Sequence, residues 1–248
     1  DTIMTIYGDV MKFDCYENYT NLTGIDVSHN KTLVNLYVNY NDITSLDVSG
    51  CTNLKYLYAE ENPSLTTLKV SGCTSLEDLE CYNTALTTLD VSACKNLRYL
   101  DCYDNSSLTT LKVSGCTSLK KLYCYNSALT TLDVSNCIFL ENLYCSNNKL
   151  TSLGLTNCIN LSYLYCDTNA LTSLNVADCI NLSTLYCFGN DFSTESFDDL
   201  MCSMHANGGE FYPLYSVSDS KAEIFSKTNG QNAIDKGWNI RTTVRTDT

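Results

Sequence analysis

The sequence reads LENLYCSNN at residues 140–148, LSYLYCDTN at residues 161–169 and LSTLYCFGN at residues 182–190. All three stretches fit the pattern L-x-x-L-x-C-x-x-N, which recurs at a spacing of 21 or 22 residues after one longer first step. The nine copies start at Val10, Leu33, Leu54, Leu76, Leu97, Leu119, Leu140, Leu161 and Leu182. Such regular self-similarity indicates a solenoid in which each copy is one coil.

Alternation within each copy predicts a short strand. The leucines at positions 1 and 4 and the residue at position 6 should point inward, while positions 3, 5 and 7 should point outward. Position 9 holds Asn18, Asn41, Asn62, Asn105, Asn148, Asn169 and Asn190, with Thr84 and Ser127 as polar replacements. Because a buried turn leaves backbone groups that need partners, we expect these side chains to bond from one coil to the next.

The second half of each copy repeats the first, as in Leu86–Val91 (LTTLDV). The nested pattern, over roughly residues 10–192, resembles the IRREKO subclass of bacterial leucine-rich repeats, with Cys in place of Leu at position 6 and of Asn at position 19. The resemblance implies a curved, right-handed solenoid of the kind found in secreted or surface-exposed bacterial proteins. A chain that begins at Asp1 rather than Met fits a mature secreted protein or a cloned fragment.

The predicted fold class is an α/β-class solenoid dominated by β structure. We expect a leucine-rich repeat solenoid with a parallel concave sheet, and short extended segments on the opposite face because Thr, Val and Asp there are poor helix formers. The expected domains are an N-terminal capping strand at residues 1–9, about nine coils at residues 10–191 and a C-terminal cap at residues 192–248.

Both ends should cap the repeats. Residues 2–7 alternate like a strand that pairs with the first coil. The tail predicts a helix at Glu195–Met204 capped by Ser193 or Thr194, a strand at Glu210–Tyr215, short helices at Ser220–Lys227 and Asn232–Lys236, and a strand at Trp238–Val244. Pro213 would be tolerated in its strand only at a sheet edge, and the sole tryptophan, Trp238, should plug the end of the core.

Fourteen of the 15 cysteines fall on two repeat positions, and Cys202 stands alone in the tail. Position 6 holds Cys15, Cys81, Cys102, Cys124, Cys145, Cys166 and Cys187, and position 19 holds Cys51, Cys73, Cys94, Cys116, Cys137, Cys158 and Cys179. We favour two internal ladders of reduced thiols, which act as small apolar side chains. Disulfides between coils and a metal ladder are the alternatives, although stacked side chains suit disulfide torsions badly and no C-x-x-C motif is present.

Tyrosines gather on the outward positions of the first-half strands. Thirteen of the 18 tyrosines lie there: Tyr16, Tyr37, Tyr56, Tyr58, Tyr82, Tyr99, Tyr103, Tyr123, Tyr125, Tyr144, Tyr163, Tyr165 and Tyr186. The second-half strands show Thr, Ser, Asp and Lys instead. Since propensity alone would place tyrosine on both faces, we predict a binding face that comprises these tyrosines except Tyr16, together with Glu80 and Asp101.

Acidic residues outnumber basic ones by 28 to 15, which gives a net charge of −13. This charge argues against nucleic-acid binding, and the absence of an 18-residue apolar run argues against a transmembrane segment. Seven acids lie beside the tyrosines and suggest a basic partner: Glu60, Glu61, Glu77, Asp78, Glu80, Asp101 and Asp104.

Catalysis is not expected. Glu80 and Asp101 lie one coil apart, as in a glycosidase pair, but on an open sheet we expect nothing to shift their pKa values. His29 and His205 have no implied partner.

The sequence therefore predicts a non-catalytic recognition module that binds a protein, without cofactor or metal, monomeric, and secreted or on the cell surface. A glycan-binding face and a structural spacer without a ligand are the alternatives.

Overall fold

The computed structural model describes residues 2–16, 22–28, 30–214, 222–228 and 230–242. The chain forms two compact units, residues 1–129 and 130–248. The predictions for Asn18, for His29 and for the element ends at Tyr215, Ser220 and Val244 lie outside the described residues.

In the first unit, the first half of each coil forms a three-residue strand. These strands are β2 (Lys12–Asp14), β4 (Asn35–Tyr37), β6 (Tyr56–Tyr58), β8 (Asp78–Glu80), β10 (Tyr99–Asp101) and β12 (Lys121–Tyr123). They pair in parallel in that order, and equivalent repeat positions lie opposite each other, as Leu36, Leu57 and Leu79 do. The register is therefore set by the repeat itself.

The second halves form a second set of short strands in this unit, and none of the described coils is helical there. They are β3 (Leu22–Asp26), β5 (Ser45–Asp47), β7 (Thr67–Lys69), β9 (Thr88–Asp90) and β11 (Thr110–Lys112). β1 (Thr2–Thr5) pairs in parallel with β3, which confirms that the N-terminal segment adds a strand to the first coil.

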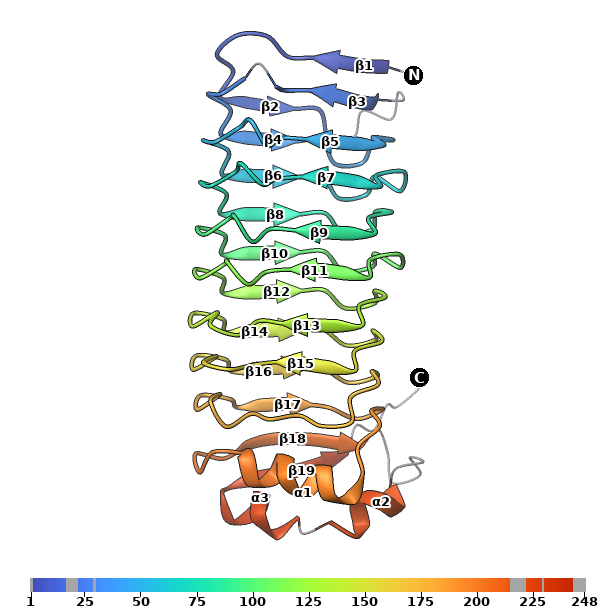
Figure 1. The fold of residues 1–248 in the computed structure, drawn as a ribbon, viewed down its shortest axis with the longest axis vertical. Coiled ribbons are helices and arrows are strands. Elements are labelled where there is room, and N and C mark those ends of the chain that lie inside the picture. Colours follow the sequence, from blue (N-terminus) through green and yellow to red (C-terminus); the bar gives the residue numbers. More distant parts are fainter. Residues whose placement is uncertain (1, 17–21, 29, 215–221, 229, 243–248) are drawn as a thin grey trace. The chain divides into compact units, whose positions relative to one another are not determined.

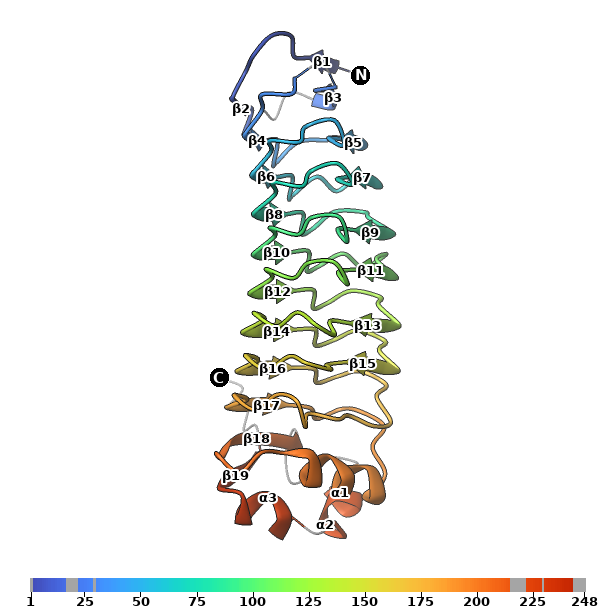
Figure 2. The same ribbon diagram turned by 60° about the vertical axis from the view of Figure 1, so that its left-hand side comes forward.

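The core of the first unit lies between the even-numbered and odd-numbered strands, which form two columns (Figures 1 and 2). Leu54 and Leu57 from the first halves and Leu65 and Val70 from the second halves are all buried. One coil has too few such side chains to exclude water from both of its halves, so stacking supplies most of the burial.

The position-9 asparagines bond between coils as expected. The Asn62 Nδ2 donates to the carbonyl oxygens of Val38 in the preceding coil and Ala59 in its own coil, both at 3.0 Å. Its Oδ1 accepts from the backbone N–H of Ile43 at 3.0 Å. One buried amide thus satisfies three backbone groups at the turn.

Thirteen of the fourteen ladder cysteines are buried in the core, Cys15 is half-buried, and all 15 cysteines are free thiols. The position-19 thiols also link coils: the Sγ atoms of Cys73 and Cys116 donate to the carbonyls of Val48 and Val91 at 3.1 and 3.2 Å. Cysteine in place of asparagine therefore keeps one inter-coil hydrogen bond in less space.

The second unit continues the same pattern and ends in a cap. Its strands are β13 (Thr131–Asp133), β14 (Asn142–Tyr144), β15 (Ser152–Gly154), β16 (Tyr163–Tyr165), β17 (Thr184–Tyr186), β18 (Gly209–Leu214) and β19 (Trp238–Thr242). Its helices are α1 (Thr194–Ser203), α2 (Ala222–Ser226) and α3 (Gln231–Asp235). The strands β14, β16, β17, β18 and β19 pair in parallel in that order, so the cap adds two strands to the sheet, as predicted.

The cap is built largely as its sequence indicates. Ser193 is the N-cap of α1 and forms a capping box with Ser196. Trp238 is buried, and its indole Nε1 donates to the carbonyl of His205 at 3.0 Å. One prediction is wrong: Pro213 does not lie in an edge strand, because β18 has β17 and β19 on its two sides. A register shift between Phe211 and Leu214 in the β18–β19 pair accommodates the missing N–H.

Candidate ligand-binding face

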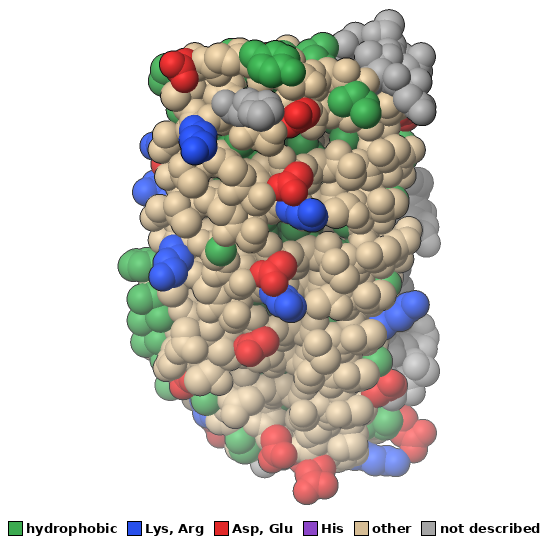
Figure 3. All heavy atoms as spheres, turned by 45° about the horizontal axis from the view of Figure 1, so that its top comes forward, with side chains coloured by type: hydrophobic (Ala, Val, Ile, Leu, Met, Phe, Trp, Pro, Cys, Tyr) green, Lys and Arg blue, Asp and Glu red, His purple; other side chains and the backbone are tan. Residues whose placement is uncertain are grey.

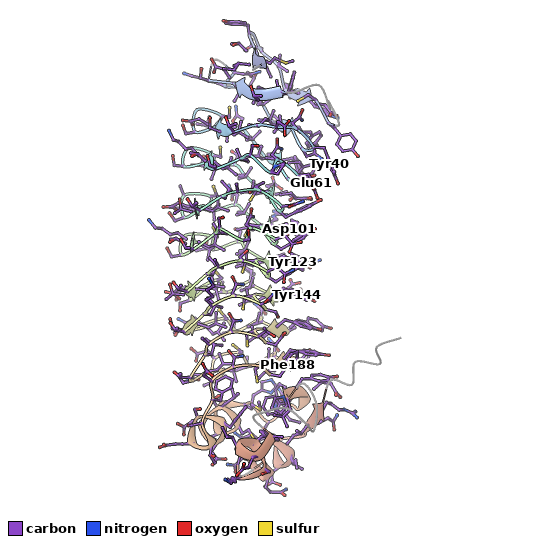
Figure 4. The ribbon with its side chains drawn as sticks, turned by 90° about the vertical axis from the view of Figure 1, so that its right-hand side faces the viewer. Tyr40, Glu61, Asp101, Tyr123, Tyr144 and Phe188 are labelled. Atoms are coloured by element: carbon purple, nitrogen blue, oxygen red, sulfur yellow. The ribbon has the colours of Figure 1, made fainter. Side chains whose placement is uncertain are left out.

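On each unit, we call the outward side chains of the even-numbered strands and of β17, together with the second residue after each of the strands β2 to β17 in this set, the tyrosine face. All fourteen residues predicted for the ligand site lie on these strands or two residues after them. In the first unit, Asp101 and Tyr123 point to the same side as Tyr40 and Glu61, and in the second unit Tyr144 and Phe188 share one side (Figure 4). The structure thus brings the predicted residues of each unit onto one surface.

In the first unit the tyrosine rings form stacks along the sheet. Tyr82, Tyr103 and Tyr125 make one stack with ring centroids 4.5 and 4.6 Å apart and interplanar angles of 8° and 6°. Tyr37 and Tyr58 stack at 4.8 Å. Parallel strands place equivalent side chains roughly 4.8 Å apart, so rings that stand up from the sheet stack on one another.

The other predicted tyrosines of the face lie outside these stacks. Tyr99 and Tyr123 pack at a tilt, with ring centroids 5.6 Å apart. Tyr56 is half-buried, and in the second unit Tyr163 is 42% exposed. Tyr163 is therefore a suitable position for a crosslinking group that would react with a ligand bound to this face.

The second unit carries a longer stack that runs into the cap. The ring centroids of Tyr144, Tyr165 and Tyr186 follow one another at 4.5 Å, and the ring centroid of Tyr212 on β18 lies 3.9 Å from that of Tyr186. Tyr212 was missed by sequence reasoning because it lies beyond the last repeat. The signal that could have found it is the predicted cap strand, whose register pairs Tyr212 with Tyr186.

The second-half strands have a different surface chemistry, and we use the name odd-numbered strands for these alone: β3, β5, β7, β9, β11, β13 and β15. Their outward residues are mainly Thr, Ser, Asp and Lys, and two of the acids pair with a lysine one coil away: Asp47 with Lys69 and Asp90 with Lys112, each with an N–O distance of 3.3 Å. Figure 3 shows a surface on which charged side chains are sparse and acidic and basic ones lie side by side. Charges on the odd-numbered strands are thus largely matched within the molecule.

Four carboxyl groups lie together among the tyrosines of the first unit and form what we call the acidic cluster: Glu60, Asp78, Glu80 and Asp101. Glu80 is paired in register with Asp101 on one side and Tyr58 on the other. Glu60 and Asp101 are only 4% and 7% exposed. Among the described residues, none of the four forms an ion pair.

Hydrogen bonding satisfies the acidic cluster only in part. The Asn39 Nδ2 donates to Glu60 Oε1 at 2.6 Å, and the Tyr99 hydroxyl donates to Asp101 Oδ2 at 3.0 Å. Three further carboxyl oxygens are buried without a hydrogen-bond partner among the described residues: Glu60 Oε2, Asp78 Oδ1 and Asp101 Oδ1. Buried acceptors of this kind are costly to leave unpaired.

Burial is the main cause of raised pKa values in the acidic cluster. It raises the pKa of Glu60 and of Glu80 to about 7, and that of Asp78 and of Asp101 to about 6. For Glu80, the charges of the other three acids raise the pKa further. These values differ from our expectation that an open sheet would leave Glu80 and Asp101 unshifted, because the tyrosine rings around them exclude water.

The remaining acids near the tyrosines have partners. Glu77 pairs with Lys55 at 2.9 Å. Glu61 and Asp104 accept hydrogen bonds from the side-chain amides of Asn83 and Asn126 at 2.6 and 2.7 Å. Only four of the seven acids noted in the sequence therefore make up the acidic cluster, and Glu60 and Asp78 are its members that the predicted site omitted.

The raised pKa values do not by themselves make a catalytic site. A glycosidase places two carboxyl groups on either side of the scissile bond, whereas Glu80 and Asp101 project from neighbouring strands of one sheet face. No group of His, Cys, Asp or Glu among the described residues could hold a metal ion. Within the same part of the chain, no helix is long and apolar enough to cross a membrane.

Comparison with solved structures agrees with this architecture. The chain is similar to the functional domain of InlJ from Listeria monocytogenes, which includes a cysteine ladder: identity is 29%, the TM-score is 0.71, and the match covers 94% of this chain and 49% of that one. The chain thus spans about half the length of the InlJ domain. It also matches a leucine-rich repeat protein of Leptospira interrogans at 23% identity and a TM-score of 0.50, over 75% of this chain and 62% of that one.

No protein-family model and no curated protein matches the sequence. The fold assignment therefore depends on the nested repeat, on the two columns of parallel strands and on the likeness to solved structures. Together they show that the chain has the parallel β-solenoid fold of leucine-rich repeat proteins, with a cysteine ladder in its core.

Proposed function

We propose that this chain is a non-catalytic recognition module that binds a protein through the tyrosine face. The observation that carries the proposal is the asymmetry between the two columns of strands. The second-half strands β3, β5, β7, β9, β11, β13 and β15 form without tyrosine, so tyrosine is not needed to hold the coils together. Tyrosine offers a large contact area with a polar tip at a low cost in side-chain entropy, which suits recognition surfaces.

The stacking geometry favours a protein over a glycan. A sugar ring packs on a free aromatic face, but both faces of Tyr103 are covered by Tyr82 and Tyr125. Tyr165 is covered in the same way by Tyr144 and Tyr186. Such stacks present ring edges and hydroxyl groups to a ligand, and these suit the mixed polar and apolar surface of a protein.

We also propose that the chain acts outside the cytoplasm, as a secreted or surface protein related to the IRREKO-like repeats. The support is the resemblance of the repeat and the likeness to InlJ. The proposal predicts no cofactor, and a monomer in the absence of its partner.

Photo-crosslinking tests the proposed surface. We would place p-benzoylphenylalanine at Tyr163, which is exposed on the tyrosine face, and in a matched variant at Thr110, which is exposed on β11. With extracellular proteins from the source or its host as the mixture, a discrete protein adduct should form from position 163 and not from position 110. Equal adducts from both positions, or an adduct from position 110 alone, would contradict the proposal.

A further inference from the structure

We propose that the acidic cluster is the receptor for an arginine side chain of the protein partner, seated between the carboxyl groups and the tyrosine rings around them. This inference rests on the proposed function and names the chemistry that one part of the face recognises. The first unit shows a contrast: Asp47 and Asp90 on the odd-numbered strands each pair with a lysine one coil away, whereas no acid of the acidic cluster pairs with a cation among the described residues.

The unpartnered oxygens provide the second, independent observation. Glu60 and Asp101 are more than nine-tenths buried, and each keeps one oxygen without a hydrogen bond, as does Asp78. A guanidinium group carries five N–H donors in a planar fork and no acceptor. It can therefore donate to several carboxylate oxygens at once, whereas a lysine ammonium is a compact point charge with three donors.

The surrounding rings suit a guanidinium as well. Tyr58 and Tyr99 lie on the strands on either side of Glu80 and Asp78. The face already holds one cation in this manner: the Lys12 Nζ lies 5.0 Å from the ring centroid of Tyr37. Arginine packs on tyrosine faces more readily than lysine does.

Access to the acidic cluster runs through Glu80. Glu80 is half-buried and so reaches solvent, while the free oxygens of Glu60 and Asp101 are buried. Rotation of the Tyr99 side chain, whose hydroxyl bonds Asp101, would give access to the Asp101 carboxylate. Side-chain rotations at a protein surface are fast compared with protein association.

Charge coupling predicts that binding releases protons. Two kinds of titratable group face the acidic cluster. The tyrosines have raised pKa values and stay neutral, and they are Tyr58, Tyr82, Tyr99 and Tyr103. The acids Glu61 and Asp104 lie at its rim. A bound cation lowers the carboxyl pKa values and expels the protons that burial retains. Affinity should therefore fall as the pH is lowered from 8 to 5.

The test uses fluorescein-labelled peptides in which glycine alternates with arginine, with lysine or with citrulline, the uncharged near-isostere of arginine. Fluorescence anisotropy would be measured for the wild type, for Glu80→Gln/Asp101→Asn, and for Asp47→Asn/Asp90→Asn, which removes the same charge from the odd-numbered strands. Circular dichroism verifies that each variant is folded.

The arginine peptide should bind more tightly than the lysine peptide, and the citrulline peptide should not bind. The cluster variant should lose about tenfold or more in affinity, as expected for a desolvated charge pair, and the control variant less than about twofold, since exposed charges contribute little. Equal losses in both variants, or equal binding of the citrulline peptide, would overturn the inference. So would micromolar Ca²⁺ binding that Glu80→Gln/Asp101→Asn abolishes, because the acidic cluster would then be a metal site.

Failure of this inference can be told apart from failure of the proposed function. If a purified protein partner loses affinity when face tyrosines are replaced but binds Glu80→Gln/Asp101→Asn normally, only the arginine receptor is wrong. If neither change affects the partner, the tyrosine face itself is not the binding surface.

Discussion

Replacing Asp101 by asparagine should stabilise the folded protein at neutral pH, although it removes a charge from the tyrosine face. Asp101 is 7% exposed, and burial raises its pKa from 3.8 to about 6. A group whose pKa is raised on folding contributes stability below its unfolded pKa, near 4, and loses that contribution as the pH rises through about 6. Ionisation of Asp101 therefore weakens the fold at pH 7 and above.

The size of the effect follows from the shift. About two pKa units at about 1.4 kcal/mol per unit give an upper limit near 3 kcal/mol. Asparagine keeps an oxygen that can accept the Tyr99 hydroxyl, but its amide nitrogen replaces an oxygen that already lacks a partner. The buried donor costs about 1 to 2 kcal/mol at every pH. We therefore expect Asp101→Asn to be about 1 to 2 kcal/mol more stable than the wild type at pH 8, and its effect on stability to change by up to about 3 kcal/mol between pH 4 and pH 8.

Urea unfolding of both proteins from pH 4 to pH 8, followed by circular dichroism, measures the difference directly. Asp47→Asn is the matched control with the opposite sign. Hydrogen bonds from Ser49, together with the Lys69 charge, lower the pKa of Asp47, so its contribution is present above about pH 4 and is lost on acidification. A pH-independent difference for Asp101→Asn, or a loss of stability at pH 8, would refute the reasoning.

Three further predictions concern the solenoid. In native protein at pH 8, a thiol reagent should modify the exposed Cys202 fast and Cys15 more slowly, because burial raises the pKa of the Cys15 thiol to about 11. In denaturant the reagent should modify all 15 thiols. A count near one would show that the ladders are oxidised. Thr168→Asn should stabilise by about 0.5 to 1 kcal/mol in urea unfolding, because Thr168 has a φ of 55° that asparagine tolerates better; an unchanged midpoint would show that the turn is unstrained. Asn62→Ala should cost about 3 kcal/mol or more, because it leaves buried backbone groups unpaired; a loss below about 1 kcal/mol would mean that water replaces the amide.

The repeat made most of the solenoid predictable. Each coil has the same alternation, so one correct interpretation of Leu54 and Leu57 as inward and Tyr56 and Tyr58 as outward applies to every coil. The prediction for Pro213 failed because a bulge depends on how two particular strands meet, and single-strand patterns carry no information about that.

The tyrosines of the face were predictable from the sequence, but the state of its acids was not. Alternation places Glu60 and Asp101 outward, which suggests exposure. Their burial arises from packing against neighbouring side chains, among them Tyr99 for Asp101 and Asn39 for Glu60, and the pKa shifts follow mainly from that burial. Outward position and solvent exposure are therefore different properties on a sheet with large side chains.

The affinity of a purified protein partner tests the central claim most directly. The partner identified by crosslinking would be titrated against the wild type, against Tyr123→Ala/Tyr144→Ala/Tyr165→Ala on the tyrosine face, and against Thr88→Ala/Thr110→Ala/Thr131→Ala on the odd-numbered strands. We predict a loss of about 100-fold or more for the tyrosine variant, as expected when anchoring aromatic residues are removed, and no change for the threonine variant. A folded tyrosine variant that binds as the wild type does would contradict the claim that this face recognises a protein.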